Sequence, residues 1–296
     1  MNRIISYRVS EEENNLELLS FLKKKGLSHQ IIVGLKKTPQ GITVNDVWAY
    51  VSMKLHTNDT VKLFIKEEEK SNTYPPIPFE PDVIYEDEDL LVLNKPANMP
   101  IHPSINNYDN TLANGLMYYY QTKTSPFVFR CINRLDKNTT GLTIIAKNPL
   151  SAAILARDMK ERAIKRTYYA IVCGAPPECG TINAPIGRME DSLITRKVDF
   201  EQGKPAITHY KLIEKGEKYS LIQLVLESGR THQIRVHMSH IGHPLPGDFI
   251  YHPDFTHIDR QPLHAGELSF LHPITKKPLH LTAPLPQDMK QLLTLN

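Results

Sequence analysis

The stretch CINRLDKNTTGLTIIA, residues 131–146, joins an Arg-Leu-Asp tripeptide and a Lys-Asn-Thr-Thr-Gly segment to a short apolar run rich in β-branched side chains. Such a run is typical of a buried strand, and the segment before it is typical of a turn. Asp136 therefore lies where a strand gives way to a turn. We expect its carboxylate to be held by a rigid element and to stay open to a ligand.

A second polar cluster, SGRTHQIRVHMSHIGHP, occupies residues 228–244 and follows the strand-like run YSLIQLVLE. Its first half gathers polar and charged side chains, which are Arg230, His232, Gln233 and Arg235. If the fold brings one of these arginines to Asp136, the guanidinium would favour the ionised carboxylate, as a nucleophile or base requires. The alternative is that Asp136 only closes an Asx-type turn ahead of Gly141.

Many short strand-like segments and few helical ones follow residue 82, separated by Gly, Pro and Asn turns. Because the strands do not alternate regularly with helices, the pattern predicts an α+β fold with a mixed, mainly antiparallel sheet rather than a doubly wound parallel one. The expected strands lie at residues 82–96, 141–147, 166–174, 207–216, 219–227, 266–270 and 278–284. The expected helices lie at residues 111–122, 149–164 and 231–242.

A small α+β module precedes this region. The stretch TYPPIPFEPD carries four prolines in ten positions and reads as an extended linker. We therefore expect three parts, at residues 1–70, 71–81 and 82–296. Within the module, the expected helices are 16–26 and 28–39, the second capped by Ser28, and the expected strands are 41–50 and 60–65. Lysines at 23–25 and 36–37 gather around the helices, either as a cationic binding surface or as an ordinary solvated face.

The composition fits a globular protein, because 41% of the 296 residues are hydrophobic. No apolar run approaches the roughly 20 residues of a membrane helix, and the start MNRIISYRVSEEE does not resemble a signal peptide, so we expect a cytoplasmic location. The three cysteines have neither CxxC spacing nor a disulfide pattern. The net charge of +3 permits a nucleic-acid partner without demanding one.

The sequence contains no recognisable motif for binding a cofactor or a metal ion. There is no GxGxxG, GxxxxGK[ST] or GxSxG motif, so we expect no cofactor. Four histidines, His232, His237, His240 and His243, lack the HExxH spacing and a neighbouring acidic ligand, so we expect no metal. Tyr168 and Tyr169 open a strand on opposite faces, which leaves one of them free to stack on a flat base or transfer a proton.

Several ordered motifs between residues 82 and 286 resemble the RluA family of RNA pseudouridine synthases. They are LLVLNKPANMPIHP, NRLDKNTTGLTIIAKN, RTYYAIVCG, SGRTHQIRVHMSHIGHPLPGD and RQPLHAGELSFLHPITKKPLHLTAPLP. The N-terminal module is similar to the small S4-type RNA-binding domain that precedes the catalytic domain in many members. The resemblance implies a cofactor-free isomerase that converts uridines of ribosomal or transfer RNA to pseudouridines, with RNA as its partner. We expect the protein to be a monomer.

The resemblance also implies roles for individual residues. Asp136 would be the essential carboxylate, Tyr168 would stack on the uracil and handle the proton leaving C5, and Arg230 would pair with Asp136 and keep the nucleotide flipped out. The implied substrate-binding residues are Arg134, Thr140, Ile234, Arg235, Lys24 and Lys36. Asn133 and Thr140 depart from the family, where His and Ser are common, which puts target preference in doubt more than the reaction. The rival interpretations are a catalytically idle RNA-binding protein with the same fold and a metal-dependent nucleic-acid hydrolase that uses the histidines of residues 232–243.

Overall fold

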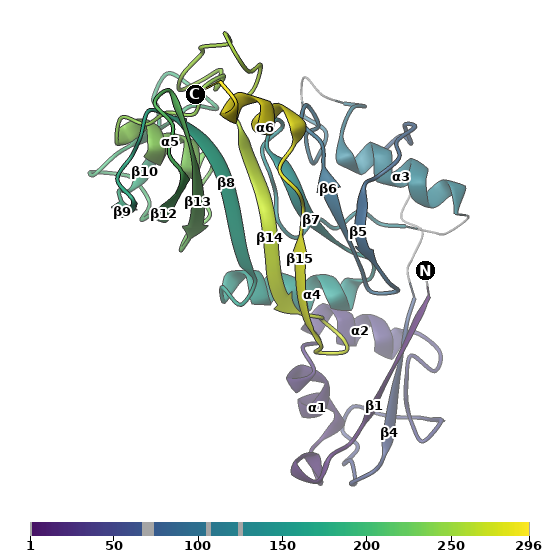
Figure 1. The fold of residues 1–296 in the computed structure, drawn as a ribbon. Coiled ribbons are helices and arrows are strands. Elements are labelled where there is room, and N and C mark those ends of the chain that lie inside the picture. Colours follow the sequence, from purple (N-terminus) through teal and green to yellow (C-terminus); the bar gives the residue numbers. More distant parts are fainter. Residues whose placement is uncertain (1, 67–73, 105–107, 124–126, 296) are drawn as a thin grey trace.

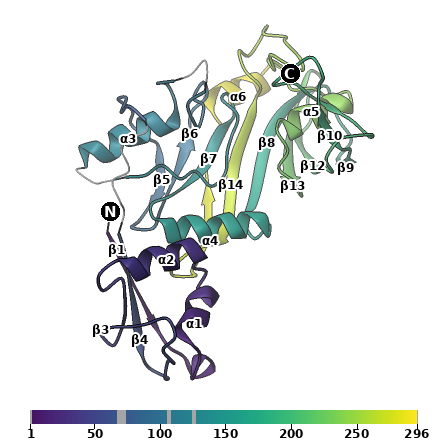
Figure 2. The same cartoon turned by 180° about the vertical axis from the view of Figure 1, so that it is seen from behind.

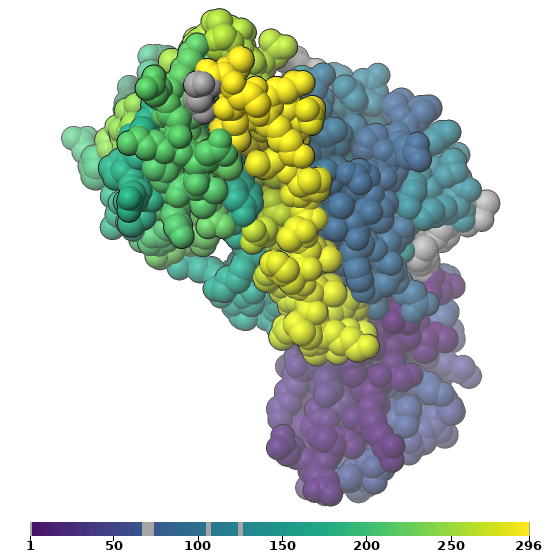
Figure 3. All heavy atoms as spheres, in the orientation of Figure 1, coloured from purple at the N-terminus to yellow at the C-terminus, as the bar shows by residue number. Residues whose placement is uncertain are grey.

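The computed structural model describes residues 2–66, 74–104, 108–123 and 127–295. Figure 1 shows one large sheet with helices at its ends and a smaller lobe, which contains the N-terminus and packs below it. The space-filling view in Figure 3 shows this lobe as a separate projection. We call residues 2–66 the N-terminal module and residues 74–295 the main unit. No helix among the described residues is both long enough and apolar enough to span a bilayer.

The N-terminal module is a four-stranded antiparallel sheet with two short helices. The strand order is β1 (Arg3–Arg8), β4 (Thr60–Ile65), β2 (Ile42–Val44) and β3 (Val47–Trp48). A 3₁₀ turn, η1 (Glu11–Glu13), precedes the helices α1 (Leu18–Lys24) and α2 (His29–Lys37). Both predicted helices are confirmed, and the Ser28 hydroxyl accepts the Ile31 N–H as the predicted cap of α2.

The predicted strand at 41–50 is a hairpin instead. Asn45 and Asp46 both have positive φ, at 50° and 64°, which is the two-residue turn that suits the twist of paired strands. Strand β1 was not predicted, because RIISYR is short and flanked by polar residues.

The main unit contains a nine-stranded sheet of described residues, ordered β5-β6-β7-β14-β8-β13-β12-β9, with β15 paired to β14. Its strands are β5 (Val83–Glu86), β6 (Leu90–Lys95), β7 (Thr140–Ala146), β8 (Lys165–Cys173), β9 (Cys179–Asn183), β12 (Ile207–Glu214), β13 (Tyr219–Leu226), β14 (Leu263–Leu271) and β15 (Pro278–Thr282). The pair β7–β14 is parallel and the other pairs are antiparallel, so the predicted mixed, mainly antiparallel sheet is confirmed.

Four helices and a small hairpin complete the main unit. The helices are α3 (Leu112–Thr122), α4 (Pro149–Lys160), α5 (Gln233–His240) and α6 (Gln287–Leu293). The hairpin pairs β10 (Ile186–Arg188) with β11 (Arg196–Val198). The sequence predicted the first three helices but not α6, the hairpin or β9. In Figure 1, α3 lies beside β5 and β6, and α5 lies at the opposite end of the sheet.

The N-terminal module shares its core with α4 of the main unit. Leu150 and Ile154 of α4 are buried in the same cluster as Phe21 and Leu22 of α1, and Figure 2 shows α4 lying against α2 from behind. Gly26 has a φ of +93°, and a Cβ at this position would lie only 2.8 Å from Cγ1 of Ile154. A glycine is therefore required where the module approaches α4.

Candidate active site

Asp136 lies in a turn that is fixed to β7 by the side chain of Asn133. The Asn133 amide donates to the Leu142 carbonyl at 2.9 Å, and its oxygen accepts the Ile144 N–H at 2.8 Å. Asn133 therefore replaces two backbone groups of a neighbouring strand and is buried. The departure from the family at Asn133 has a structural role, and its side chain is not directed at a ligand.

The same turn is held from its other side by Lys95. This buried ammonium donates to the carbonyls of Pro96 at 2.7 Å, Met99 at 2.9 Å and Lys137 at 3.0 Å. Burial lowers the pKa of Lys95 to about 7, while the three carbonyl acceptors favour the charged form. The Asp136 carbonyl closes the turn by accepting the Thr139 N–H at 3.1 Å. The carboxylate of Asp136 thus projects from a backbone that is fixed before any ligand binds.

Arg235, on α5, is the direct partner of this carboxylate. Its Nη1 lies 3.1 Å from Oδ2 of Asp136, while Nε and Nη2 form a two-pronged ion pair with Asp248 at 2.6 and 2.7 Å. Its Cζ also lies 5.1 Å from the centre of the Tyr251 ring. Burial opposes the charge, but Asp248 and Asp136 together raise the pKa of Arg235 above its usual value. The guanidinium stays charged and bridges two carboxylates.

The expected pairing of Arg230 with Asp136 is therefore wrong. Arg230 is exposed, and its Nε donates to the Pro205 carbonyl at 3.1 Å. The reason is its position: Arg230 lies in the loop before α5, whereas Arg235 lies inside the helix on its buried side. Arg230 still lines the cleft around Asp136, beside the carboxylate but without an ion pair to it among the described residues.

His232 is a further neighbour of the carboxylate. Its Nε2 lies 3.9 Å from Oδ2 of Asp136, and its Nδ1 lies 2.9 Å from the Tyr251 hydroxyl. The same hydroxyl accepts the Arg196 N–H, so Tyr251 links His232 to Arg196 while Nε2 of His232 faces Asp136. Burial lowers the pKa of His232, although the charge of Asp136 opposes this. His232 therefore adds a ring nitrogen beside the carboxylate.

The cleft that contains Asp136 has a volume of about 80 Å³ and is open to solvent. Tyr168 of β8 lines it, with its hydroxyl 3.3 Å from an Arg166 nitrogen. The next residue, Tyr169, lies on the other face of the sheet and donates to Glu267 at 2.6 Å, which confirms the predicted alternation. The remaining walls of the cleft come from the Asp136 turn, β13, the start of α5 and β14, through Arg134, Leu135, Thr139, Leu226, Gln233, Ile234 and Leu263.

The structure places the other predicted binding residues in three different locations. Arg134 and Ile234 line the cleft, Arg134 being exposed and Ile234 buried. Thr140 does not face the cleft: its hydroxyl lies 2.8 Å from Nδ1 of His264 and is buried. The predicted substrate contact of Thr140 is corrected to a contact between β7 and β14. Lys24 and Lys36 lie in the last turns of α1 and α2, on the N-terminal module.

The histidines of residues 228–244 are directed at separate partners. His237 is buried, with Nδ1 2.8 Å from the Thr208 hydroxyl and Nε2 2.8 Å from the Ala184 carbonyl. Nδ1 of His243 lies 2.9 Å from the Cys173 carbonyl. These contacts hold α5 and the following loop against the sheet.

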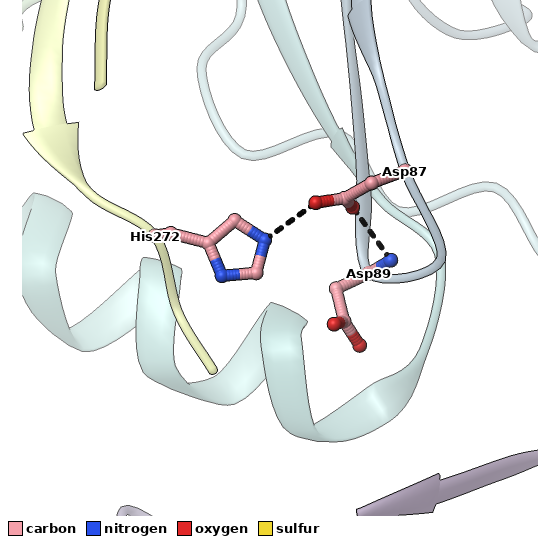
Figure 4. A group of neighbouring side chains, drawn as sticks. All are labelled: Asp87, Asp89 and His272. Atoms are coloured by element: carbon pink, nitrogen blue, oxygen red, sulfur yellow. Dashed lines mark hydrogen bonds and ion pairs between the residues drawn. The ribbon is translucent and has the colours of Figure 1, made fainter. Parts of the chain in front are cut away.

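Among the described residues, one group of side chains has the spacing of metal ligands, and it consists of Asp87, Asp89 and His272 (Figure 4). Nδ1 of His272 accepts two backbone N–H groups, so Nε2 carries the proton and donates to Asp87 at 2.8 Å. Both oxygens of Asp89 accept from Arg3 of the N-terminal module at 3.0 Å. The ligand atoms are therefore used as hydrogen-bond and ion-pair partners, and Asp89 joins the module to the main unit.

Sequence reasoning did not assign roles to Asp248 and Tyr251. The available signal was the turn PLPGD, in which Gly247 has a φ of +67° and a Cβ would meet the Ile258 carbonyl at 2.4 Å. This turn directs Asp248 into the interior, where only a buried cation can compensate its charge. The site thus consists of an oriented carboxylate with one oxygen bound to Arg235, beside a tyrosine, an imidazole and exposed arginines.

The comparisons with known proteins agree with this arrangement. A family model described as RNA pseudouridylate synthase matches residues 89–240. The uncharacterised RNA pseudouridine synthase YjbO of Bacillus subtilis is 38% identical over 269 residues, which cover 90% of this chain and 95% of that protein. The ribosomal large subunit pseudouridine synthase D of Zymomonas mobilis is 39% identical over 296 residues, which cover 94% of this chain and 90% of that protein.

A solved structure shows the same fold. The human protein RNA pseudouridylate synthase domain containing 1 aligns with a TM-score of 0.60 and 28% identity, covering 75% of this chain and 97% of that one.

Proposed function

Because this chain belongs to the RNA pseudouridylate synthase family, whose members convert uridines in RNA to pseudouridines, we propose that Asp136 is the carboxylate on which its isomerisation depends. In this reaction the bond from the ribose C1′ to N1 of uracil breaks, the base turns, and C1′ is joined to C5. N1 gains a proton from solvent and the proton on C5 leaves. The observation that carries the proposal is the ion pair from Arg235 to Asp136 inside the cleft.

Both chemical routes open to Asp136 need an ionised carboxylate in a fixed direction. It attacks the nucleoside as a nucleophile or removes a proton from it as a base, and Arg235 favours the ionised form in either case. One oxygen is bound to Arg235, and no described side chain or backbone group donates a hydrogen bond to the other. That oxygen is the reactive one in our proposal.

Tyr168 supplies the second chemical group. Its ring lines the cleft beside Asp136, so in our proposal it stacks on the flipped uracil, and its hydroxyl accepts the proton that leaves C5. Arg134 and Arg230 line the same cleft from exposed positions. We assign them to the RNA strand rather than to the carboxylate.

The RNA target we propose is ribosomal RNA of the large subunit, because relatives at 39% identity are named for that activity. The N-terminal module would add RNA affinity through Lys24 and Lys36, in keeping with its similarity to an S4-type domain. A cytoplasmic location and a monomeric state complete the proposal. Size-exclusion chromatography with light scattering checks the oligomeric state.

The experiment uses unmodified transcripts of large-subunit ribosomal RNA and of transfer RNAs, labelled with tritium at C5 of uridine. Tritium released from the ribosomal transcript at a few defined positions supports the proposal. Release from transfer RNA alone would reassign the target, and release from neither would overturn the proposed activity of the site.

A further inference from the structure

A second pocket adjoins the cleft and is lined by cations. It has a volume of about 360 Å³ and is enclosed by the β10–β11 hairpin, the 202–204 segment and the loop before α5. Four of its lining side chains are positively charged, and these are Arg188, Arg196, Lys204 and Arg230. No carboxylate lines it. Arg230 lines both this pocket and the cleft around Asp136, so the two sites are adjacent.

The hairpin holds two of these cations directly opposite each other. Arg188 and Arg196 are cross-strand partners in the β10–β11 register, an arrangement in which like charges destabilise the pair. Neither forms an ion pair with a carboxylate among the described residues, and the guanidinium of Arg196 donates instead to the carbonyls of Leu193 and Thr195. Two facing arginines without an acidic partner are stabilised when an anion binds between them.

The surrounding backbone is rigid and offers no competing negative charge inside the pocket. Ile186 and Lys204 exchange two backbone hydrogen bonds of 2.9 Å, which fixes the wall that carries Lys204. Nearby, Asp199 directs one carboxylate oxygen to the N–H groups of Glu201 and Gln202 and does not line the pocket.

The hairpin is also connected to the catalytic carboxylate. The Arg196 N–H donates to the Tyr251 hydroxyl at 3.0 Å, that hydroxyl contacts His232 at 2.9 Å, and His232 lies 3.9 Å from Asp136. The backbone of the hairpin at Arg196 is therefore connected to the residues beside Asp136.

We propose that this pocket binds a backbone phosphate of the RNA next to the flipped uridine, through Arg188, Arg196, Lys204 and Arg230. The inference rests on the proposed function, because it takes RNA as the substrate. The pocket would position the strand and add affinity, while the chemistry would stay with Asp136. A free phosphate has the same charge, so the test distinguishes an RNA phosphodiester from inorganic phosphate.

The test compares Arg188→Ala/Arg196→Ala with wild type and with a control of equal charge, Lys215→Ala/Lys277→Ala, whose residues are exposed and lie outside the pocket. The measurement is the affinity for the ribosomal transcript as a function of salt. Each lost phosphate contact reduces the slope of log K against log salt by about 0.7 for single strands, so two contacts reduce it by about 1.4. We expect this reduction in the pocket variant and not in the control.

A further variant and a stability measurement separate an effect of the lost charges from an effect on folding. Arg188→Lys/Arg196→Lys should restore most of the slope, because a phosphate contact tolerates lysine. The melting temperature of the alanine variant without RNA should stay close to that of wild type, because the removed repulsion offsets the two lost hydrogen bonds of the Arg196 guanidinium. Equal slopes for the pocket variant and the control would overturn the proposal. A phosphate-induced rise in melting temperature in wild type alone, together with equal slopes, would reassign the pocket to a free phosphate.

These binding results do not depend on catalysis. If wild type released no tritium, the proposed function would fail, while the salt slopes would still decide whether the pocket binds RNA.

Discussion

Replacing Arg235 by lysine tests whether Arg235, rather than Arg230, is the partner of the Asp136 carboxylate. The guanidinium makes three contacts of 2.6, 2.7 and 3.1 Å to Asp248 and Asp136, in a setting where its own side chain is 1% exposed. A lysine carries the same charge but only one nitrogen, which cannot hold two carboxylates in this geometry. We expect Arg235→Lys to keep the pairing with Asp248 and to lose the contact with Asp136.

The size of the effect follows from the contact that is lost. A hydrogen bond between charged groups contributes about 1.5–3 kcal/mol. If the transition state uses the orientation of Asp136, the rate falls by about 10- to 150-fold, at 1.36 kcal/mol for each factor of ten. The free energy of unfolding should fall by about 1–3 kcal/mol, less than the full cost of breaking a buried pair because the charge remains.

The assay is tritium release in single turnovers with enzyme in saturating excess, so that changes in RNA affinity do not enter the rate. The matched control is Arg230→Lys, which alters an exposed arginine bonded to the Pro205 carbonyl. At saturation this control should react at close to the wild-type rate. A slow Arg230→Lys beside an Arg235→Lys of wild-type rate would refute the pairing seen here.

Three further predictions concern the aromatic group, the acid stability and the N-terminal module. Tyr168→Phe should retain RNA affinity but lose about 10²-fold or more in single-turnover rate, because the ring remains while the proton acceptor is removed; a wild-type rate would assign Tyr168 to stacking alone. Burial opposes the charge of Glu86, but hydrogen bonds from Lys147 and Tyr120 lower its pKa to about 2. The ionised Glu86 therefore stabilises the folded protein above about pH 4.5, and this contribution is lost as the pH falls towards 2. Allowing for screening by solvent, we expect Glu86→Gln to lower the free energy of unfolding by about 1–2 kcal/mol at pH 7 and to leave it unchanged near pH 2. Urea denaturation at the two pH values measures this, and equal losses at both would contradict the prediction. Lys24→Ala/Lys36→Ala should weaken RNA binding and reduce its salt slope without changing the saturated rate, and an unchanged slope would make both lysines ordinary surface charges.

Much of the fold was predictable because it follows from local patterns. Ser28 caps its helix as expected, and the alternation of Tyr168 and Tyr169 follows from strand geometry alone. Strand β14 is longer than predicted. Its first residues, from Leu263 on, are all buried, so they show no alternation of apolar and polar side chains from which the strand could have been recognised.

The contacts between distant segments could not be derived in this way. Arg230 and Arg235 are five residues apart, and only the burial of α5 against Asp248 decides which of them reaches Asp136. The helix that became α4 was predicted from the sequence, but the packing of Ile154 against the N-terminal module was not, because the apolar residues of a helix do not identify its partner. That packing also explains why the module is best studied by point substitutions: deleting it would expose Leu150 and Ile154.

The most direct test of the account is the single-turnover rate of Asp136→Asn on tritium-labelled ribosomal transcript. The amide has the size of the carboxylate and can still accept a hydrogen bond from Arg235, but it cannot act as a nucleophile or base. We expect the rate to fall by about 10³-fold or more, with RNA affinity and melting temperature close to those of wild type. A variant that keeps a substantial part of the wild-type rate would contradict the central role of Asp136.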